Sequence, residues 1–208
     1  MKGLILKDMY SLRKYGRTML LLAVFYSFMI FMMGNADVFL GTVVIMFAVA
    51  SITSFAYDNQ AGWDIYVSTL PVSRRNVVMS KYALSYLLAL LGGLLALLVG
   101  WVNGIIKGTG NFFEMLVSAY AMFAIAVIFV SVLLPLIYKF GVERSRIIII
   151  AAVAIPVAAV MALAQTKAIP IPDEQTVKQA LLLSPLIIAA CCALSYAISN
   201  SIYRKKEV

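Results

Sequence analysis

The sequence contains no histidine, and only 12% of its 208 residues are charged, about half the share of an ordinary soluble domain. Without histidine, neither a Ser-His-Asp set nor a histidine metal site can form. All nine carboxylates are predicted to lie in loops, which leaves no paired-carboxylate site in a pocket. We therefore expect that this chain is not an enzyme and binds no metal or cofactor itself.

The sequence also lacks a G-x-x-x-x-G-K-[ST] motif, the loop with which P-loop proteins hold the phosphates of ATP. If ATP drives this protein, another polypeptide must bring the ATPase. Cysteine is scarce as well: Cys191 and Cys192 are adjacent within an apolar run, which suits neither a structural disulfide nor a zinc site. We interpret them as two small buried hydrophobic residues.

What the chain has instead is apolar length, with 63% hydrophobic residues and a mean hydropathy of +0.98. Six runs without any Asp, Glu, Lys or Arg are close to the roughly 20 residues that cross a bilayer: residues 18–34, 38–56, 83–106, 115–138, 147–164 and 180–202. In lipid each run must be a helix, because other conformations leave backbone groups unpaired. We therefore predict an all-α, polytopic membrane protein in which residues 1–208 form a single transmembrane domain of six helices.

Basic residues are distributed unevenly between these runs. Of the 17 Lys and Arg residues, 14 lie in the first, third, fifth and seventh connecting segments, and only Lys107, Lys167 and Lys178 lie in the alternate ones. By the positive-inside rule, this bias places both termini in the cytoplasm. The basic residues form no single patch, so the net charge of +8 indicates contact with lipid headgroups rather than nucleic acid. With no ionisable group expected inside the spans, proton- or sodium-coupled transport is disfavoured.

The first 17 residues have a helical pattern of their own. Apolar residues recur on one face and polar residues on the opposite one: Ile5, Leu6, Met9 and Leu12 against Lys7, Ser11 and Lys14. This spacing predicts an amphipathic helix in the inner membrane interface, ahead of the first span. A plain basic leader is the alternative.

Small residues recur every fourth position in the third run, at Gly92, Ala96, Gly100 and Gly104, and the spacing continues to Gly108. Such a stripe lets two helix backbones approach closely in lipid. It is either a subunit interface or moving seam, or ordinary packing within one subunit, and the sequence does not decide between them. Asn103 on the same helix is expected to hydrogen-bond across this seam.

The connection between the second and third runs, residues 58–81, is the most informative segment. Residues 60–69 predict a short cytoplasmic helix whose apolar contacts are Trp63, Ile65, Tyr66 and Val67. Pro71 ends this helix, and Ser73 is expected to cap the next one. Arg74, Arg75 and Lys81 are expected at the lipid headgroups. A short helix joined rigidly to two spans is a lever for a soluble partner; the alternative is an interfacial loop with its aromatic residues at the membrane surface.

Several residues of this connection resemble the signature of small bacterial ABC-2 type permeases, the membrane subunits of ABC exporters. The resemblance rests on Asp58, Gly62, residues 66–75 (Tyr-Val-Ser-Thr-Leu-Pro-Val-Ser-Arg-Arg) and Ser80-Lys81-Tyr82. It implies that residues 59–69 are a coupling helix seated in an ATPase cleft. The implied ATPase-coupling residues are Asp58, Gly62, Trp63, Asp64, Ile65, Tyr66 and Val67. The family often has Glu where this chain has Asp58, which weakens that assignment.

The resemblance also implies partners and a location. Two permease subunits, identical or related, would pair in the bacterial plasma membrane, with two separate ABC ATPase subunits that bind ATP and magnesium beneath them. A narrower similarity, to permeases that export phenol-soluble modulins and lantibiotics, implies an amphipathic peptide cargo. The alternatives are an ATP-independent channel or transporter and a structural membrane assembly protein.

Overall fold

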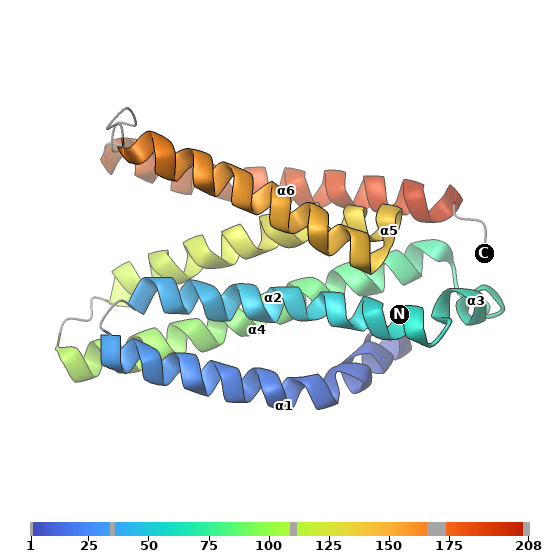
Figure 1. Ribbon diagram of the computed structural model, residues 1–208, viewed down its shortest axis with the longest axis horizontal. Coiled ribbons are helices and arrows are strands. Elements are labelled where there is room, and N and C mark those ends of the chain that lie inside the picture. The colour runs from blue at the N-terminus through green and yellow to red at the C-terminus, as the bar shows by residue number, and fades with distance from the viewer. Residues whose placement is uncertain (1, 34–35, 109–111, 166–173, 206–208) are drawn as a thin grey trace.

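The computed structural model describes residues 2–33, 36–108, 112–165 and 174–205, and that part of the chain is helical throughout apart from its turns (Figure 1). The side chains of residues 152–181 lie outside the described residues. The elements are α1 (Lys2–Met33), α2 (Ala36–Gln60), α3 (Trp63–Ser68), α4 (Arg74–Lys107), α5 (Phe112–Gln165) and α6 (Glu174–Lys205). The predicted all-α class is confirmed for these residues.

α5 is two helices joined at Gly141, whose backbone (φ 79°, ψ 174°) is not helical. Only glycine adopts this conformation without strain, since it has no Cβ. The chain reverses its direction there, and Figure 1 shows the second half of α5 running from the turn back toward the end from which the first half came. A single residue therefore makes the connection between the fourth and fifth predicted spans.

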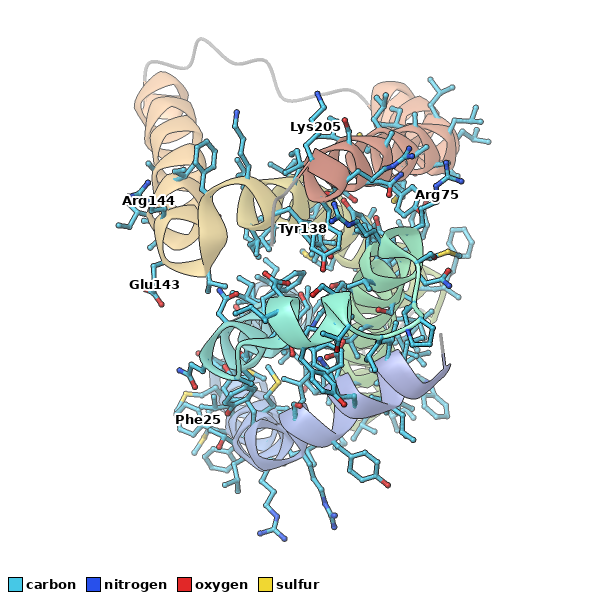
Figure 2. All side chains as sticks on the ribbon, turned by 90° about the vertical axis from the view of Figure 1, so that its right-hand side faces the viewer. Phe25, Arg75, Tyr138, Glu143, Arg144 and Lys205 are labelled. Carbon is cyan, nitrogen blue, oxygen red and sulfur yellow. The ribbon has the colours of Figure 1, made fainter. Side chains whose placement is uncertain are left out.

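The long helical segments run back and forth along one axis. The amino terminus, α3, the turn of α5 and the carboxyl terminus all lie at the same end of the molecule, which we call the α3 end (Figure 1). The four basic segments that the sequence assigns to one side of the membrane thus meet at one end of the bundle. Figure 2 views this end along the helices, with Arg75, Glu143, Arg144 and Lys205 at its periphery.

Four helical stretches among the described residues are long and apolar enough to cross a membrane: Gly41–Gln60, Arg74–Ile106, Met115–Ser145 and Leu182–Lys205. They correspond to the second, third, fourth and sixth predicted spans, so the chain is a multi-pass membrane protein. The first predicted span lies in α1 up to Met33. The fifth lies in the second half of α5, mostly among residues whose side chains are not described.

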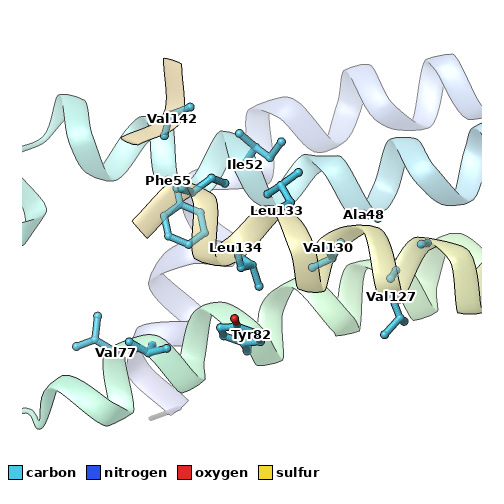
Figure 3. Packing of buried hydrophobic residues seen from close by; sticks show 14 of the residues in the cluster. Ala48, Ile52, Phe55, Val77, Tyr82, Val127, Val130, Leu133, Leu134 and Val142 are labelled. Carbon is cyan, nitrogen blue, oxygen red and sulfur yellow. The ribbon is translucent and has the colours of Figure 1, made fainter. Parts of the chain in front are cut away.

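The core lies between α2, α4 and the first half of α5, and Figure 3 shows part of it, with Phe55, Tyr82 and Leu134 among the labelled residues. α2 and α4 approach closely at Gly92, where an added Cβ would lie 2.8 Å from Phe47 Cβ and 3.2 Å from Val44 Cα. The whole stripe of Gly92, Ala96, Gly100 and Gly104 is buried within the chain. Of the two alternatives for the stripe of small residues, the structure therefore supports ordinary packing within one subunit at Gly92.

Two details of the third span differ from expectation. Gly108 is no part of a packing stripe, because it ends α4 as a left-handed cap with φ 65°. Asn103 is buried, but its Oδ1 accepts no hydrogen bond from the described residues, so that oxygen does not make the expected bond across the seam. The cysteines differ too: Cys191 and Cys192 are free and half-buried rather than buried.

Hydrogen bonds between side chains join α4 to α5 and α6. Tyr82 Oη lies 2.6 Å from Ser195 Oγ and 2.8 Å from Ser199 Oγ, and Tyr86 Oη lies 3.0 Å from Ser131 Oγ. Ser195 Oγ also donates to the carbonyl oxygen of Ser131. Hydrogen bonds of this kind replace the hydrophobic effect that lipid cannot supply, at about 0.6–2 kcal/mol each.

Candidate functional site

The short helix predicted over residues 60–69 is present as α3 (Trp63–Ser68), and local chemistry explains both its ends. Gly62 precedes it in the left-handed conformation, with φ 62° and ψ 30°. Thr69 closes it, and Pro71 prevents its continuation into α4. Ser73 then caps α4 as expected, because its Oγ accepts the backbone N–H of Asn76 at 3.3 Å.

α3 presents two different faces. Ile65 and Tyr66 point outward, with 69% and 57% of their surface exposed. Val67 is buried, and Trp63 packs partly buried against the core of the bundle. Asp64 accepts a long hydrogen bond, 3.5 Å, from Tyr203 Oη of α6. The four residues predicted as apolar contacts of this helix therefore lie on two of its faces: Ile65 and Tyr66 outward, Trp63 and Val67 toward the bundle.

Beneath α3 lies a closed cluster of four charged side chains, which we call the ion-pair cluster: Lys7 and Asp8 of α1, Asp58 of α2 and Lys81 of α4. Lys7 Nζ lies 2.6 Å from Asp58 Oδ1 and 3.0 Å from Asp8 Oδ1. Lys81 Nζ lies 3.0 Å from Asp8 Oδ1 and 2.5 Å from Asp58 Oδ2. Each cation thus contacts both anions, and the cluster is neutral.

Burial makes this cluster different from a surface salt bridge. The exposed side-chain fractions are 1% for Asp8, 5% for Lys81, 13% for Asp58 and 27% for Lys7. Removing one partner from such a buried pair costs about 3–5 kcal/mol, because the other charge stays buried without compensation. An exposed pair contributes about 0–1 kcal/mol. We therefore expect that a neutral replacement of one of the four residues destabilises the protein, unless a residue of opposite charge is replaced with it.

Further contacts join the ion-pair cluster to α3 and to the core. Lys7 Nζ lies over the ring of Trp63, 3.8 Å from its centroid, in a cation–π contact. Lys81 Nζ donates to Ser54 Oγ at 2.7 Å and lies 4.8 Å from the centroid of the Phe55 ring. The cluster therefore connects α1, α2, α3 and α4 at one point.

The cluster corrects two expectations from the sequence. Lys81, expected at the lipid headgroups, is buried, whereas Arg74 and Arg75 are exposed. Asp8 and Asp58, expected in loops, lie within α1 and α2. One signal was available: Leu4, Asp8 and Leu12 share a helical face, and an acid on an apolar face needs a buried partner. The apolar face predicted from the sequence instead included Leu6 and Met9, which are both exposed. It also placed Lys7 on the polar face, whereas Lys7 points inward to Asp58.

A cavity of about 150 Å³ lies beside the ion-pair cluster, between α2, α3, α4, α5 and α6. Asp58, Trp63, Lys81 and Tyr203 line it together with Tyr138, which lies near the centre of the end view in Figure 2. The Tyr138 hydroxyl is buried and has no hydrogen-bond partner among the described residues. A space of this size holds a few water molecules and excludes a peptide cargo.

The residues of this site divide between an outward face and a face that packs on the bundle. Among the described residues, no three His, Cys, Asp or Glu side chains gather into a metal-binding group. The predicted coupling residues split into an outward pair, Ile65 and Tyr66, and a set that faces the bundle, made of Asp58, Trp63, Asp64 and Val67. An exposed apolar pair on a braced helix offers a protein partner an anchor, with charged residues directly behind it.

Comparison with known proteins identifies a family. The model of a family described as ABC-2 family transporter protein matches residues 3–204. No curated protein matches the chain, and neither does any solved structure. The match covers all the helices that form the site.

Proposed function

The chain belongs to the ABC-2 family of transporter proteins, and on this premise we propose that it is the transmembrane permease subunit of an ATP-driven ABC exporter. A separate ABC ATPase binds ATP and magnesium and docks on α3. In this proposal the chain crosses the bacterial plasma membrane six times, with α3 and both termini in the cytoplasm. The 14-to-3 distribution of basic residues supports this orientation.

The outward face of α3 is the observation that carries the proposal. Ile65 and Tyr66 are exposed on a helix that lies at one end of the bundle, where basic residues gather. Their neighbours Trp63 and Val67 brace the same helix against the core. Aromatic and aliphatic anchors in a partner's cleft typically cost about 2 kcal/mol or more when truncated. The braced helix then converts a push from the partner into movement of α2 and α4, which flank it.

The remaining partners are a second permease subunit, identical or related, and lipid. Only 11% of the α6 span is buried within the chain, against 56% of the α2 span. α6 therefore keeps an apolar surface that lipid or a second subunit covers. The proposed cargo is an amphipathic peptide, which the narrower family resemblance supports and which a largely uncharged bundle suits.

Copurification tests the docking of α3. A candidate ABC ATPase subunit of the same organism is coexpressed with wild-type permease and with the Ile65→Ala/Tyr66→Ala variant, and its recovery is measured after membrane extraction. We expect the double variant to lose most of the ATPase, since both anchors are gone. The matched control is Leu182→Ala/Leu186→Ala, an apolar pair on α6 that is more exposed, at 80% and 70%, and this control should keep the ATPase.

Two results would contradict the proposal. Equal ATPase recovery by the double variant and the wild type would show that α3 is not the docking element. Poor membrane insertion of the double variant together with normal ATPase binding would show that Ile65 and Tyr66 only anchor the chain at the membrane surface.

A further inference from the structure

The ion-pair cluster can pair its four charges in two ways. In the first pairing, Lys7 binds Asp58 and Lys81 binds Asp8, at 2.6 and 3.0 Å. In the second, Lys7 binds its chain neighbour Asp8 and Lys81 binds Asp58, at 3.0 and 2.5 Å. All four distances are within ion-pair range at once, so the structure lies between the two pairings.

The two pairings connect different helices. The first ties α1 to α2 through Lys7 and Asp58, and to α4 through Asp8 and Lys81. The second keeps one pair inside α1 and the other between α2 and α4. Only in the second pairing can the amino-terminal part of α1 move away from α2 and α4 without leaving a buried charge unpaired. Since an unpaired buried charge is strongly unfavourable, the second pairing is what makes such a movement possible.

The geometry points to a conformational latch: we infer that exchange of Lys7 from Asp58 to Asp8 releases the amino-terminal part of α1 from the bundle. Trp63 links the latch to α3, because its ring contacts the same Lys7 Nζ at 3.8 Å. A displacement of α3 changes the surroundings of Lys7 first and so biases the exchange. This last link rests on the proposed docking of an ATPase on α3; the exchange itself does not.

Variants of the cluster separate a latch from a merely structural role. Asp58→Asn leaves Asp8 as the one remaining acid beside the buried Lys81, so α1 cannot leave without stranding a buried, unpaired Lys81, and the latch stays closed. Lys7→Gln/Asp8→Asn removes the two charges that α1 contributes to the cluster and leaves Asp58 paired with Lys81. No ion pair then ties α1 to α2 or α4 at the cluster, so α1 is released. A latch therefore predicts opposite effects from two variants that share a site, whereas a structural role predicts the same kind of loosening from both.

The test is a distance measurement between spin labels at Gly3→Cys on α1 and Gln60→Cys on α2, in a variant lacking Cys191 and Cys192 and reconstituted in nanodiscs without any ATPase. Both positions are exposed, and a side chain at residue 3 meets nothing within 4 Å. We expect two distance populations in the wild type, loss of the longer one in Asp58→Asn, and a shift to the longer one in Lys7→Gln/Asp8→Asn. The thermal unfolding of each labelled variant is measured alongside, to show that it is folded.

One distance distribution shared by all three proteins would overturn the inference, as would broadening in the same direction for both variants. Addition of the ATPase with ATP forms a separate arm. If it leaves a wild-type exchange unchanged, the link to α3 is wrong while the latch stands. Loss of ATPase binding in the α3 variant tests the proposed function independently of either result.

Discussion

Gly92→Ala is expected to destabilise the bundle, whereas Gly93→Ala, one residue further along α4, is expected to leave it unchanged or more stable. At position 92 the new Cβ would lie 2.8 Å from Phe47 Cβ, 3.2 Å from Val44 Cα and 3.3 Å from the Val44 carbonyl oxygen. Two of these atoms are backbone of α2, so relief requires that α2 and α4 separate. At position 93 the nearest atoms belong to Phe123, at 3.7 Å, which is ordinary contact.

The magnitude follows from two opposing contributions. Replacing glycine by alanine within a helix favours folding by about 1 kcal/mol at either position. Overpacking of a close contact costs about 1–3 kcal/mol, and this cost applies at position 92 alone. The two variants should therefore differ in free energy of unfolding by about 1–3 kcal/mol. For a chain of this size, that corresponds to about 2–4 °C in Tm per kcal/mol.

Thermal unfolding in nanodiscs, followed by the fluorescence of Trp63 and Trp101, measures this difference. Because both variants introduce the same methyl group into the same helix, effects of reconstitution cancel in the comparison. Equal melting temperatures, or a lower one for Gly93→Ala, would refute the close packing of α2 on α4 and with it the placement of the small-residue stripe.

Three further predictions test other parts of the structure. Gly141→Ala should lower stability by about 1–3 kcal/mol in the same unfolding assay, since φ 79° and ψ 174° strain any residue with a Cβ even though nothing crowds it; a Tm equal to wild type would mean that the turn of α5 is built differently. Tyr82→Phe should cost about 1 kcal/mol through the lost hydrogen bonds to α6, and no change would show that the two helices are not joined there. In a variant without Cys191 and Cys192, a cysteine at Phe113 should react with an impermeant reagent in intact cells while one at Arg75 should not, and the reverse pattern would invert the topology.

Much of the fold could be predicted because its signals are local. Apolar runs without charges predict helices, and the described parts of all six runs are helical. Pro71 and Ser73 define where α3 ends and α4 begins without reference to any other helix. The alternation of basic segments predicted that the termini and α3 lie at the same end, which depends only on the number of reversals of the chain.

The contacts between helices could not be predicted in the same way. The pairing of Asp8 with Lys81 joins residues 73 positions apart, and nothing local indicates which face of α1 meets α4. The repeat of small residues shows that α4 has a face for close packing, but not that α2 is the helix that fills it at Gly92. The sequence predicts Trp63 as an apolar contact of the short helix, but its position over Lys7 depends on the fold of α1.

The most direct measurement is ATP turnover by the coexpressed ABC ATPase in nanodiscs, alone, with this chain, and with the Ile65→Ala/Tyr66→Ala variant. An ATP-driven permease subunit predicts that the wild-type chain changes the turnover several-fold and that the variant does not, while the Leu182→Ala/Leu186→Ala control behaves as wild type. The same turnover with and without the chain, or transport by the chain when no ATPase is present, would contradict the account.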